Sequence, residues 1–206
     1  HTHIYLPEFD EDRQQVVQRA KDSGVKHLIL PNVDTETIEP LLSCCEQFNG
    51  YCTPAMGLHP TSVAADYMQA LRNIEKELQN SGRYCAIGEI GLDLYWDKTY
   101  LKEQIEGLRI QFRWAYELNL PVIIHIRDAF DEIIPVLEKS PVPVRGVFHS
   151  YTGTAEQAKM ISRLGDFIFG INGIVTFKKS TVRPIIPELG IDRIVLETDA
   201  PYLAPV

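Results

Sequence analysis

Six histidine and acidic side chains in this chain have the types and the placement expected of metal ligands. Each falls at or near the carboxyl end of an apolar, β-rich segment or just past it. In a parallel barrel those ends converge on one face, so ligands far apart in sequence would meet around one pocket. Imidazole together with carboxylate suits zinc, manganese and related divalent ions. The candidate metal ligands are His1, His3, Glu89, His125, His149 and Asp199.

A single histidine in a β segment is more often a structural residue than a ligand. The alternation of His1 and His3, however, puts both rings on the same side of an extended segment. Five ligand-type residues at the same end of five segments also make the structural interpretation less plausible than a metal site. His27, which stands at the start of its segment and away from the others, is interpreted as structural.

Six candidates are more than one tetrahedral ion needs, and this predicts a binuclear centre. Two divalent ions would lie about 3.5–4 Å apart, with a carboxylate bridging them. Glu89 is the expected bridge. Gly88 and Gly91 beside it allow close backbone approach, or else serve a tight turn. Zinc, magnesium and manganese all remain open as the metals.

Apolar, β-rich segments alternate with helical patterns, which is typical of parallel strands joined by crossover helices. Because no Gly-x-Gly-x-x-Gly loop follows any strand, we expect an α/β fold of the TIM-type (β/α)8 barrel class rather than an open doubly wound sheet. The predicted strands are His1 to Tyr5, Val25 to Leu30, Cys52 to Leu58, Tyr84 to Ile90, Pro121 to Ile126, Val144 to His149, Phe167 to Ile171 and Arg193 to Glu197.

The clearest predicted helix follows Asp97, where apolar residues recur at three- and four-residue steps from Leu101 to Leu118 and form one stripe facing the sheet. Two more are expected, one after Asp10 ending at Gly24 and one over 155–164. The last helix of the barrel is expected to be absent, since the chain stops soon after its last strand and lacks an initiator Met. We therefore expect an excerpt of a longer protein, with residues 1–206 forming a single domain.

The composition narrows the class of protein. The chain has 206 residues, 45% of them hydrophobic, and a net charge of −8 with a pI of about 5.2. This charge argues against a protein that coats nucleic acid through a broad basic surface, but not against an enzyme that grips one phosphodiester locally. No apolar run is long enough for a membrane span, so a cytoplasmic protein without a membrane partner is expected. The four cysteines show no Cys-x-x-Cys spacing and are expected to be reduced, packed thiols.

Several short motifs, collinear along nearly the whole chain, resemble the signature segments of the TatD family of metal-dependent deoxyribonucleases. They are His1-Thr2-His3, AMGLHP (55–60), GEIGLD (88–93), PVIIHIRDA (121–129), FHSYTG (148–153) and LETDAPYLAP (196–205). Tyr5 and Pro7 depart from the usual family pattern, outside the ligand set. The resemblance implies a metal-dependent hydrolase on an amidohydrolase-like TIM barrel, acting as a deoxyribonuclease and often as an exonuclease.

Carried over to this sequence, the family pattern implies that His1, His3, Glu89 and Asp199 bind one ion. It implies that Glu89, His125 and His149 bind the other. Two such ions can lower the pKa of a water, orient it for attack on phosphorus and neutralise developing charge. Asp199 and Glu89 are the expected catalytic residues, with Asp199 as the proton acceptor and Glu197 positioning it from the same face.

Other polar and aromatic residues near the predicted mouth suggest substrate contacts. Arg127 has the planar fork that holds a phosphate, although it could instead pair with a neighbouring aspartate. His59 could contact substrate phosphate or order its loop. Tyr95 and Trp96 could stack an unpaired base or simply pack. Asp93 could hold a metal-site histidine in one tautomer or cap a turn.

The expected reaction is hydrolysis of phosphodiester bonds in DNA, single-stranded or at ends, with the oligomeric state left open. Related barrels hydrolyse amides, lactones or cyclic imides, so an amidohydrolase is the alternative. The ligand set, which contains no bridging lysine, and Arg127 favour phosphodiesters. A catalytically inactive metal-binding scaffold is the remaining alternative.

Overall fold

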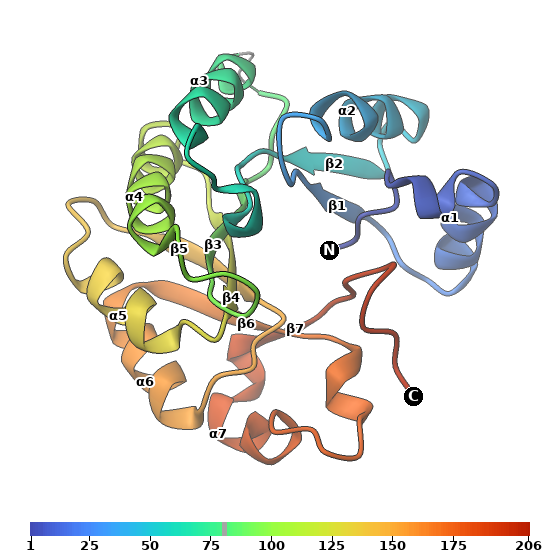
Figure 1. Cartoon of the computed structure of the whole chain (residues 1–206). Helices are drawn as coiled ribbons and strands as arrows, with labels where there is room; N and C mark the ends of the chain where they lie inside the picture. Colours follow the sequence, from blue (N-terminus) through green and yellow to red (C-terminus); the bar gives the residue numbers. More distant parts are fainter. Residues whose placement is uncertain (80–81) are drawn as a thin grey trace.

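Helices and parallel strands alternate along the computed structural model of the chain, which describes residues 1–79 and 82–206 (Figure 1). The strands are β1 (Leu28–Pro31), β2 (Cys52–Ala55), β3 (Ile87–Asp93), β4 (Val122–Arg127), β5 (Arg145–His149), β6 (Asp166–Ile171) and β7 (Ile194–Leu196). The α-helices are α1 (Arg13–Asp22), α2 (Ile38–Gln47), α3 (Tyr67–Leu78), α4 (Leu101–Glu117), α5 (Phe130–Glu138), α6 (Ala155–Leu164) and α7 (Ile186–Leu189). Among the described residues, no helix is long and apolar enough to cross a membrane.

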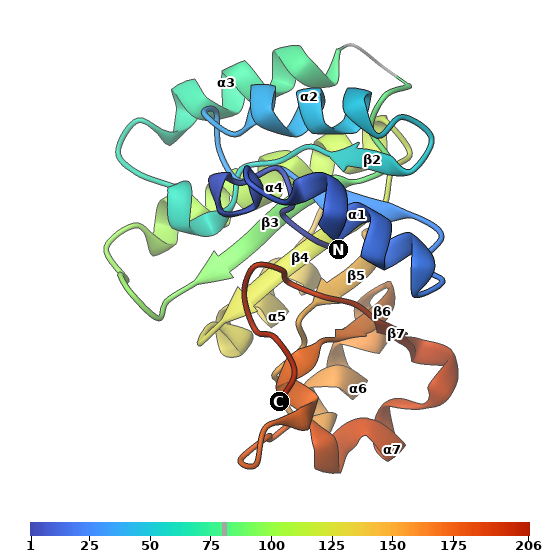
Figure 2. The ribbon, with the colours of Figure 1, turned by 90° about the vertical axis from the view of Figure 1, so that its right-hand side faces the viewer.

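The strands follow one another in chain order. β1 pairs with β2, and β3 to β7 form a five-stranded parallel sheet. A parallel bridge between Met56 and Ile87 links the two groups, and the amide of Gly88 donates to the carbonyl of Met56 over 3.1 Å. With helices packed outside the strands, this is the predicted TIM-type barrel arrangement (Figure 2).

The first and last segments of the chain lie side by side, as both views show (Figures 1 and 2). The amide of Thr2 donates to the carbonyl of Ile29 in β1 over 3.2 Å, and the amide of His3 donates to the carbonyl of Ala200 over 2.8 Å. The histidines at the start of the chain therefore face the segment that follows β7.

The strand predicted over His1 to Tyr5 is wrong, and the described residues contain seven strands rather than eight. The amide of Leu6 donates to the carbonyl of His3 over 3.0 Å and closes a turn directly after the second histidine. The segment still occupies a strand's place, since its two backbone amides bond to the segments on either side.

Helix α4 confirms the helix predicted after Asp97. Leu108, Phe112 and Ala115 lie buried on the face that packs against the sheet, whereas Leu118 is 37% exposed beyond the last turn. Predicted helices 155–164 and the one after Asp10 are also present, as α6 and α1.

Two buried amide side chains on the same helix hold the strand ends. Gln104 accepts from the amide of Asp93 (2.9 Å) and donates to its carbonyl (3.1 Å). Gln111 does the same for Leu58 (2.7 and 3.3 Å). Each amide satisfies one buried backbone residue completely, so the two loops that leave β2 and β3 are tied to one rigid helix.

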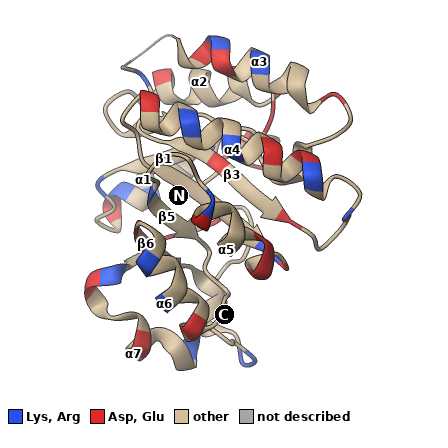
Figure 3. Cartoon of the chain, turned by 90° about the vertical axis from the view of Figure 1, so that its left-hand side faces the viewer, with Lys and Arg blue, Asp and Glu red and all other residues tan. Residues whose placement is uncertain are grey.

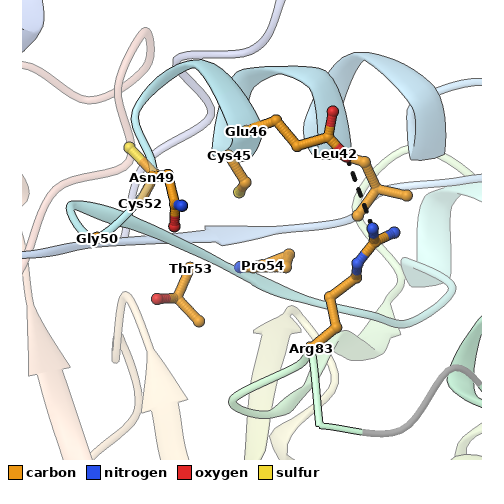
Figure 4. A pocket seen from close by; sticks show the side chains of 9 residues that line it. All are labelled: Leu42, Cys45, Glu46, Asn49, Gly50, Cys52, Thr53, Pro54 and Arg83. Atoms are coloured by element: carbon orange, nitrogen blue, oxygen red, sulfur yellow. Dashed lines mark ion pairs between the residues drawn. The ribbon is translucent and has the colours of Figure 1, made fainter.

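The cysteines are free, as predicted, and three of them are buried. Cys45 and Cys52 line a pocket at the amino end of β2, closed on one side by α2 (Figure 4). Arg83 and Glu46 face each other across it at 3.6 Å. None of the predicted site residues lines this pocket, which lies at the strand ends opposite to those from which the ligands project. In barrels of this kind that face serves stability.

Candidate metal centre

All six predicted ligands converge on one place, at the carboxyl ends of the strands. His125 lies in β4 and is in register with His149, the last residue of β5. Asp199 lies three residues beyond β7, and His1 and His3 lie beside it. Glu89 lies within β3 rather than at its end, because that strand continues to Asp93.

The backbone around Glu89 is irregular in a way that aims its side chain. The pairing of β3 with β4 shifts between Ile87 and Ile90, where one extra residue is accommodated, and such bulges re-aim side chains. Gly91 has a φ of +151°, and a Cβ there would stand 1.8 Å from the carbonyl oxygen of His125. Of the two roles considered for the glycines, close backbone approach is therefore the one the structure shows at Gly91.

The carboxylate of Glu89, 2% exposed, faces different imidazoles with its two oxygens. Oε2 lies 3.3 Å from His1 Nε2 and 3.6 Å from His3 Nε2. Oε1 lies 3.2 Å from His125 Nδ1 and 4.0 Å from His149 Nε2. This is the arrangement that a bridging carboxylate requires.

Asp199 completes the first of these groups. Its Oδ1 lies 3.6 Å from His1 Nε2, 3.5 Å from His3 Nε2 and 3.3 Å from His149 Nε2. The rings of His1 and His149 stack at 3.5 Å, so His149 stands between the two groups. Sets of three residues close enough to share one ion are His1–Glu89–His149, His1–His3–Asp199 and His59–Glu89–His125.

A hydroxyl group outside the predicted ligand set orients His3. The Nδ1 atom of His3 lies 3.0 Å from the hydroxyl of Tyr5, which in turn donates to the carbonyl of Pro31 over 2.6 Å. Because the Tyr5 hydroxyl donates its proton to Pro31, it can only accept a hydrogen bond from His3. His3 therefore carries its proton on Nδ1, and the lone pair of its Nε2 faces the carboxylates. Tyr5 was seen in the sequence only as a departure from the family pattern, although its place two residues after His3 puts it near the same ring.

Carboxylates hold two further histidines in the tautomer a metal needs. His125 Nε2 lies 2.8 Å from Asp93 Oδ2, and His149 Nδ1 lies 2.9 Å from Glu197 Oε1. In His125 the hydrogen bond to Asp93 puts the proton on Nε2 and leaves Nδ1 facing the centre. In His149 the nearby Glu197 charge favours the proton on Nδ1, although the two atoms lie outside hydrogen-bond geometry. Asp93 has both roles considered for it, because its Oδ1 also accepts from the amide of Tyr95 over 3.0 Å.

Glu197 was expected to position Asp199 and instead contacts His149. Its Oε1 also accepts from the amide of Ser150 over 2.6 Å. Gly170 makes room for this, since a Cβ there would stand 1.9 Å from the Glu197 carboxylate. The carboxylate therefore leans across the neighbouring strand toward β5, which the two-residue spacing from Asp199 could not reveal.

His59 joins the group around His125 but turns its protonated nitrogen, rather than its free one, toward the centre. Its Nδ1 accepts from the amide of Thr61 over 3.2 Å, so the neutral ring carries its proton on Nε2. That nitrogen lies 3.8 Å from Glu89 Oε1. Burial and the charge of His125 lower the pKa of His59 to about 3, which keeps the ring neutral. His59 is therefore built as a hydrogen-bond donor toward the centre.

Arg127 ends β4, two residues beyond His125, at the same mouth. Among the described residues, no ion pair joins it to Asp128 or Asp131. Its guanidinium instead lies over the ring of Tyr95, with Cζ 3.6 Å from the ring centroid.

The donor set fits divalent metal ions. Four imidazoles turn a ring nitrogen, and two carboxylates turn oxygens, toward one small buried volume. The Nδ1 atom of buried His1 finds no hydrogen-bond partner among the described residues. Without a metal, protons must hold these groups together. Burial lowers the pKa of His125, but hydrogen bonds to Asp93 and Glu89 outweigh it and raise the pKa to about 8. Burial likewise lowers the pKa of His149, but the negative charge of Glu89 outweighs it and raises the pKa to about 10.

This gives a prediction for the metal-free protein: its stability should fall as the pH rises from 6.5 toward 10. The folded-state pKa values of His125 and His149 exceed the ordinary value of 6.5, so their contribution is complete below pH 6.5 and is lost above about 8 and 10. For His125 the effect is on the order of 2 kcal/mol, or about 4–8 °C in Tm. Thermal unfolding of EDTA-treated protein from pH 6 to 9.5 measures it.

The control for this measurement is His27→Asn, outside the centre, which should keep the pH dependence, whereas His125→Asn should weaken it. Added zinc or manganese should stabilise the protein more at pH 8 than at pH 6, because ligands must lose their protons to bind a metal. A metal-free Tm that is flat over this range would show that the histidines are not coupled to the carboxylates.

Comparison with known proteins places this site in a family. The family model described as TatD related DNase matches residues 1–206. Over 207 residues the chain is 35% identical to "Uncharacterized metal-dependent hydrolase YabD" of Bacillus subtilis, covering 100% of this chain and 80% of that protein. It is 35% identical over 201 residues to "3'-5' ssDNA/RNA exonuclease TatD" of Erwinia billingiae, covering 96% and 76%.

A solved structure agrees with these sequence matches. The TatD homolog YjjV of Escherichia coli K12 superimposes with a TM-score of 0.90 at 30% identity, covering 100% of this chain and 80% of that one. Two independent comparisons, of sequence and of structure, thus cover the whole chain, including every segment that carries a predicted ligand. The chain belongs to the TatD-related family of metal-dependent hydrolases.

Proposed function

We propose that this protein is a metal-dependent nuclease that removes nucleotides from the end of single-stranded DNA. The observation that carries the proposal is the buried carboxylate of Glu89, whose two oxygens face two separate groups of imidazoles. This arrangement suits two divalent ions, and two-ion sites are common among enzymes that hydrolyse phosphodiesters. The name of the Erwinia relative, a 3'-5' exonuclease on single-stranded DNA and RNA, supports the same class of substrate.

In this proposal His1, His3, Glu89 and Asp199 hold one ion, and Glu89, His125 and His149 hold the other. Zinc, magnesium and manganese are the candidates. Bound ions would supply the acidity that activates a water and the positive charge that neutralises the phosphate oxygens.

The protein's own groups complete the site. Asp199, whose side chain is 18% exposed and so reachable from the mouth, accepts the proton of the attacking water. The Nε2–H of His59 donates to a phosphate oxygen. The guanidinium of Arg127 lies at the mouth of the site and binds the phosphate backbone of the strand there.

The charge distribution suits local binding at an end rather than coating of a long strand. Acidic and basic residues are interspersed along α3 and α4, α5 carries acidic residues alone, and the side of the molecule seen in Figure 3 has no broad basic face. With a net charge of −8, attraction to nucleic acid must come from the metal centre and its immediate surroundings.

The test is degradation of a single-stranded DNA oligonucleotide, labelled at the 3' or the 5' end, with magnesium, manganese, zinc or EDTA added in turn. We expect metal-dependent shortening from one end and none in EDTA, and the two labels give the polarity. An RNA of the same sequence tests the choice of sugar. Absence of cleavage with every metal would favour an amide or lactone hydrolase, and metal binding without any hydrolysis would indicate a scaffold.

A further inference from the structure

Two aromatic side chains stand in solvent beside the metal centre. Trp96 is 77% exposed and Tyr95 is 49% exposed, in the loop that follows β3. The chain's other tryptophan, Trp114, is 6% exposed and donates to Glu75. Leaving a large aromatic surface in water is unfavourable, so a pair of them at a mouth calls for an explanation.

Arg127 joins the two rings into one cluster. Its Cζ lies 3.6 Å from the Tyr95 ring centroid and 5.7 Å from that of Trp96, both within the range of cation–π attraction. The two rings meet edge to face, with centroids 4.6 Å apart and planes at 89°. We call Tyr95, Trp96 and Arg127 the aromatic platform.

The platform is tied to the metal centre by one carboxylate. Asp93 faces His125 with Oδ2 and accepts the amide of Tyr95 with Oδ1. The amide of Leu94 donates to the carbonyl of Arg127 over 2.9 Å, which fixes the loop to β4. The start of the loop that carries the two rings is therefore held beside His125 and β4.

The platform lies close to the metal centre along β4. Arg127 lies two residues beyond His125 on β4, a distance of about 6.6 Å at 3.3 Å per residue. A strand with its phosphate at the metal centre would thus bring a base one or two nucleotides from that phosphate to the platform.

We infer that the aromatic platform of Tyr95, Trp96 and Arg127 stacks an unpaired base of the substrate strand, one or two nucleotides from the cleaved bond. This inference rests on the proposed nuclease function. Stacking requires a free base face, which a duplex covers on both sides, so the platform selects single-stranded over double-stranded substrate. In this inference Arg127 contacts a base of the strand as well as its phosphate backbone.

Binding is measured through the fluorescence of Trp96 in a Trp114→Phe background, with the metal ions bound and with phosphorothioate linkages in the strand so that cleavage is suppressed. A short single-stranded DNA should quench the emission. The same oligonucleotide with abasic tetrahydrofuran units at its three terminal positions, which keeps every phosphate, should quench far less. Equal quenching by both strands would overturn the inference, since phosphate contacts alone would then explain binding.

Kinetics provide a second test that does not depend on the Trp114→Phe variant. Trp96→Ala and Tyr95→Ala should each raise KM for single-stranded DNA roughly tenfold, with kcat nearly unchanged. Their KM for the abasic strand should match the wild type. Tyr116→Ala, which removes a 56% exposed aromatic from α4, is the matched control and should change neither.

The outcomes separate this inference from the proposed function. Metal-dependent cleavage with an unaltered KM in Trp96→Ala and Tyr95→Ala would support the proposed nuclease function and contradict the role of the platform. Base-dependent quenching in a protein that cleaves no DNA with any metal would support the platform as a base-binding site and contradict the proposed nuclease function.

Discussion

Replacement of Glu89 by glutamine should lower turnover by more than about 100-fold and leave the fold in place. Substitution of groups that merely orient metal ligands typically costs 10–100-fold, and Glu89 faces both imidazole groups directly. Glutamine keeps the shape of the side chain and the backbone bond from the Glu89 amide to the carbonyl of Asn32. It removes the negative charge that would hold two cations together.

The measurement combines kcat on single-stranded DNA with the metal content of the purified protein, which should fall below that of the wild type. Glu188→Gln is the matched control, because Glu188 pairs with Lys159 on the exposed surface and should tolerate the change. If Glu89→Gln retained wild-type turnover and metal content, the proposed centre would be wrong.

Asp199→Asn should lower kcat by about 10²–10⁴-fold, the usual contribution of a positioned general base. Burial raises the pKa of Asp199, but contacts with His149 and His3 more than compensate and hold it below its usual range, so the group is ready to accept a proton at neutral pH. Asparagine accepts hydrogen bonds through its carbonyl but takes no proton. KM should change much less than kcat, because Asp199 is assigned to the reacting water and not to the strand.

Two comparisons distinguish this role from simple loss of metal. Asp199→Asn should keep more of its metal than Glu89→Gln, since the imidazoles of His125 and His149 and the bridging carboxylate remain. Asp166→Asn, which changes a largely exposed carboxylate near Arg193, should behave as wild type. A variant that loses all metal and regains full turnover when metal is added in excess would make Asp199 a ligand only.

Local patterns in the sequence were enough to predict the barrel fold and the set of residues that gather at its mouth. The apolar stripe from Leu101 to Leu118 predicted α4, because side chains three and four residues apart share one face of a helix. The ligand types at strand ends predicted convergence, because parallel strands of a barrel end on one face. Both rules need only spacing along the chain.

The pairing of those residues was decided by tertiary structure. The strand expected over His1 to Tyr5 is a turn, and the histidines are instead fixed by bonds to Ile29 and Ala200, which are distant in sequence. The bulge in β3 re-aims Glu89 only when β4 lies against it.

Which group orients which ligand also depended on the fold. Glu197 serves His149 rather than Asp199, because the neighbouring strand offers Gly170 as space. Gln104 and Gln111 support the site through hydrogen bonds that no sequence spacing encodes. The sequence by itself determined the fold class and the chemical types gathered at one mouth; the tertiary structure decided the hydrogen-bond partners, because these depend on distances between strands and not on positions along the chain.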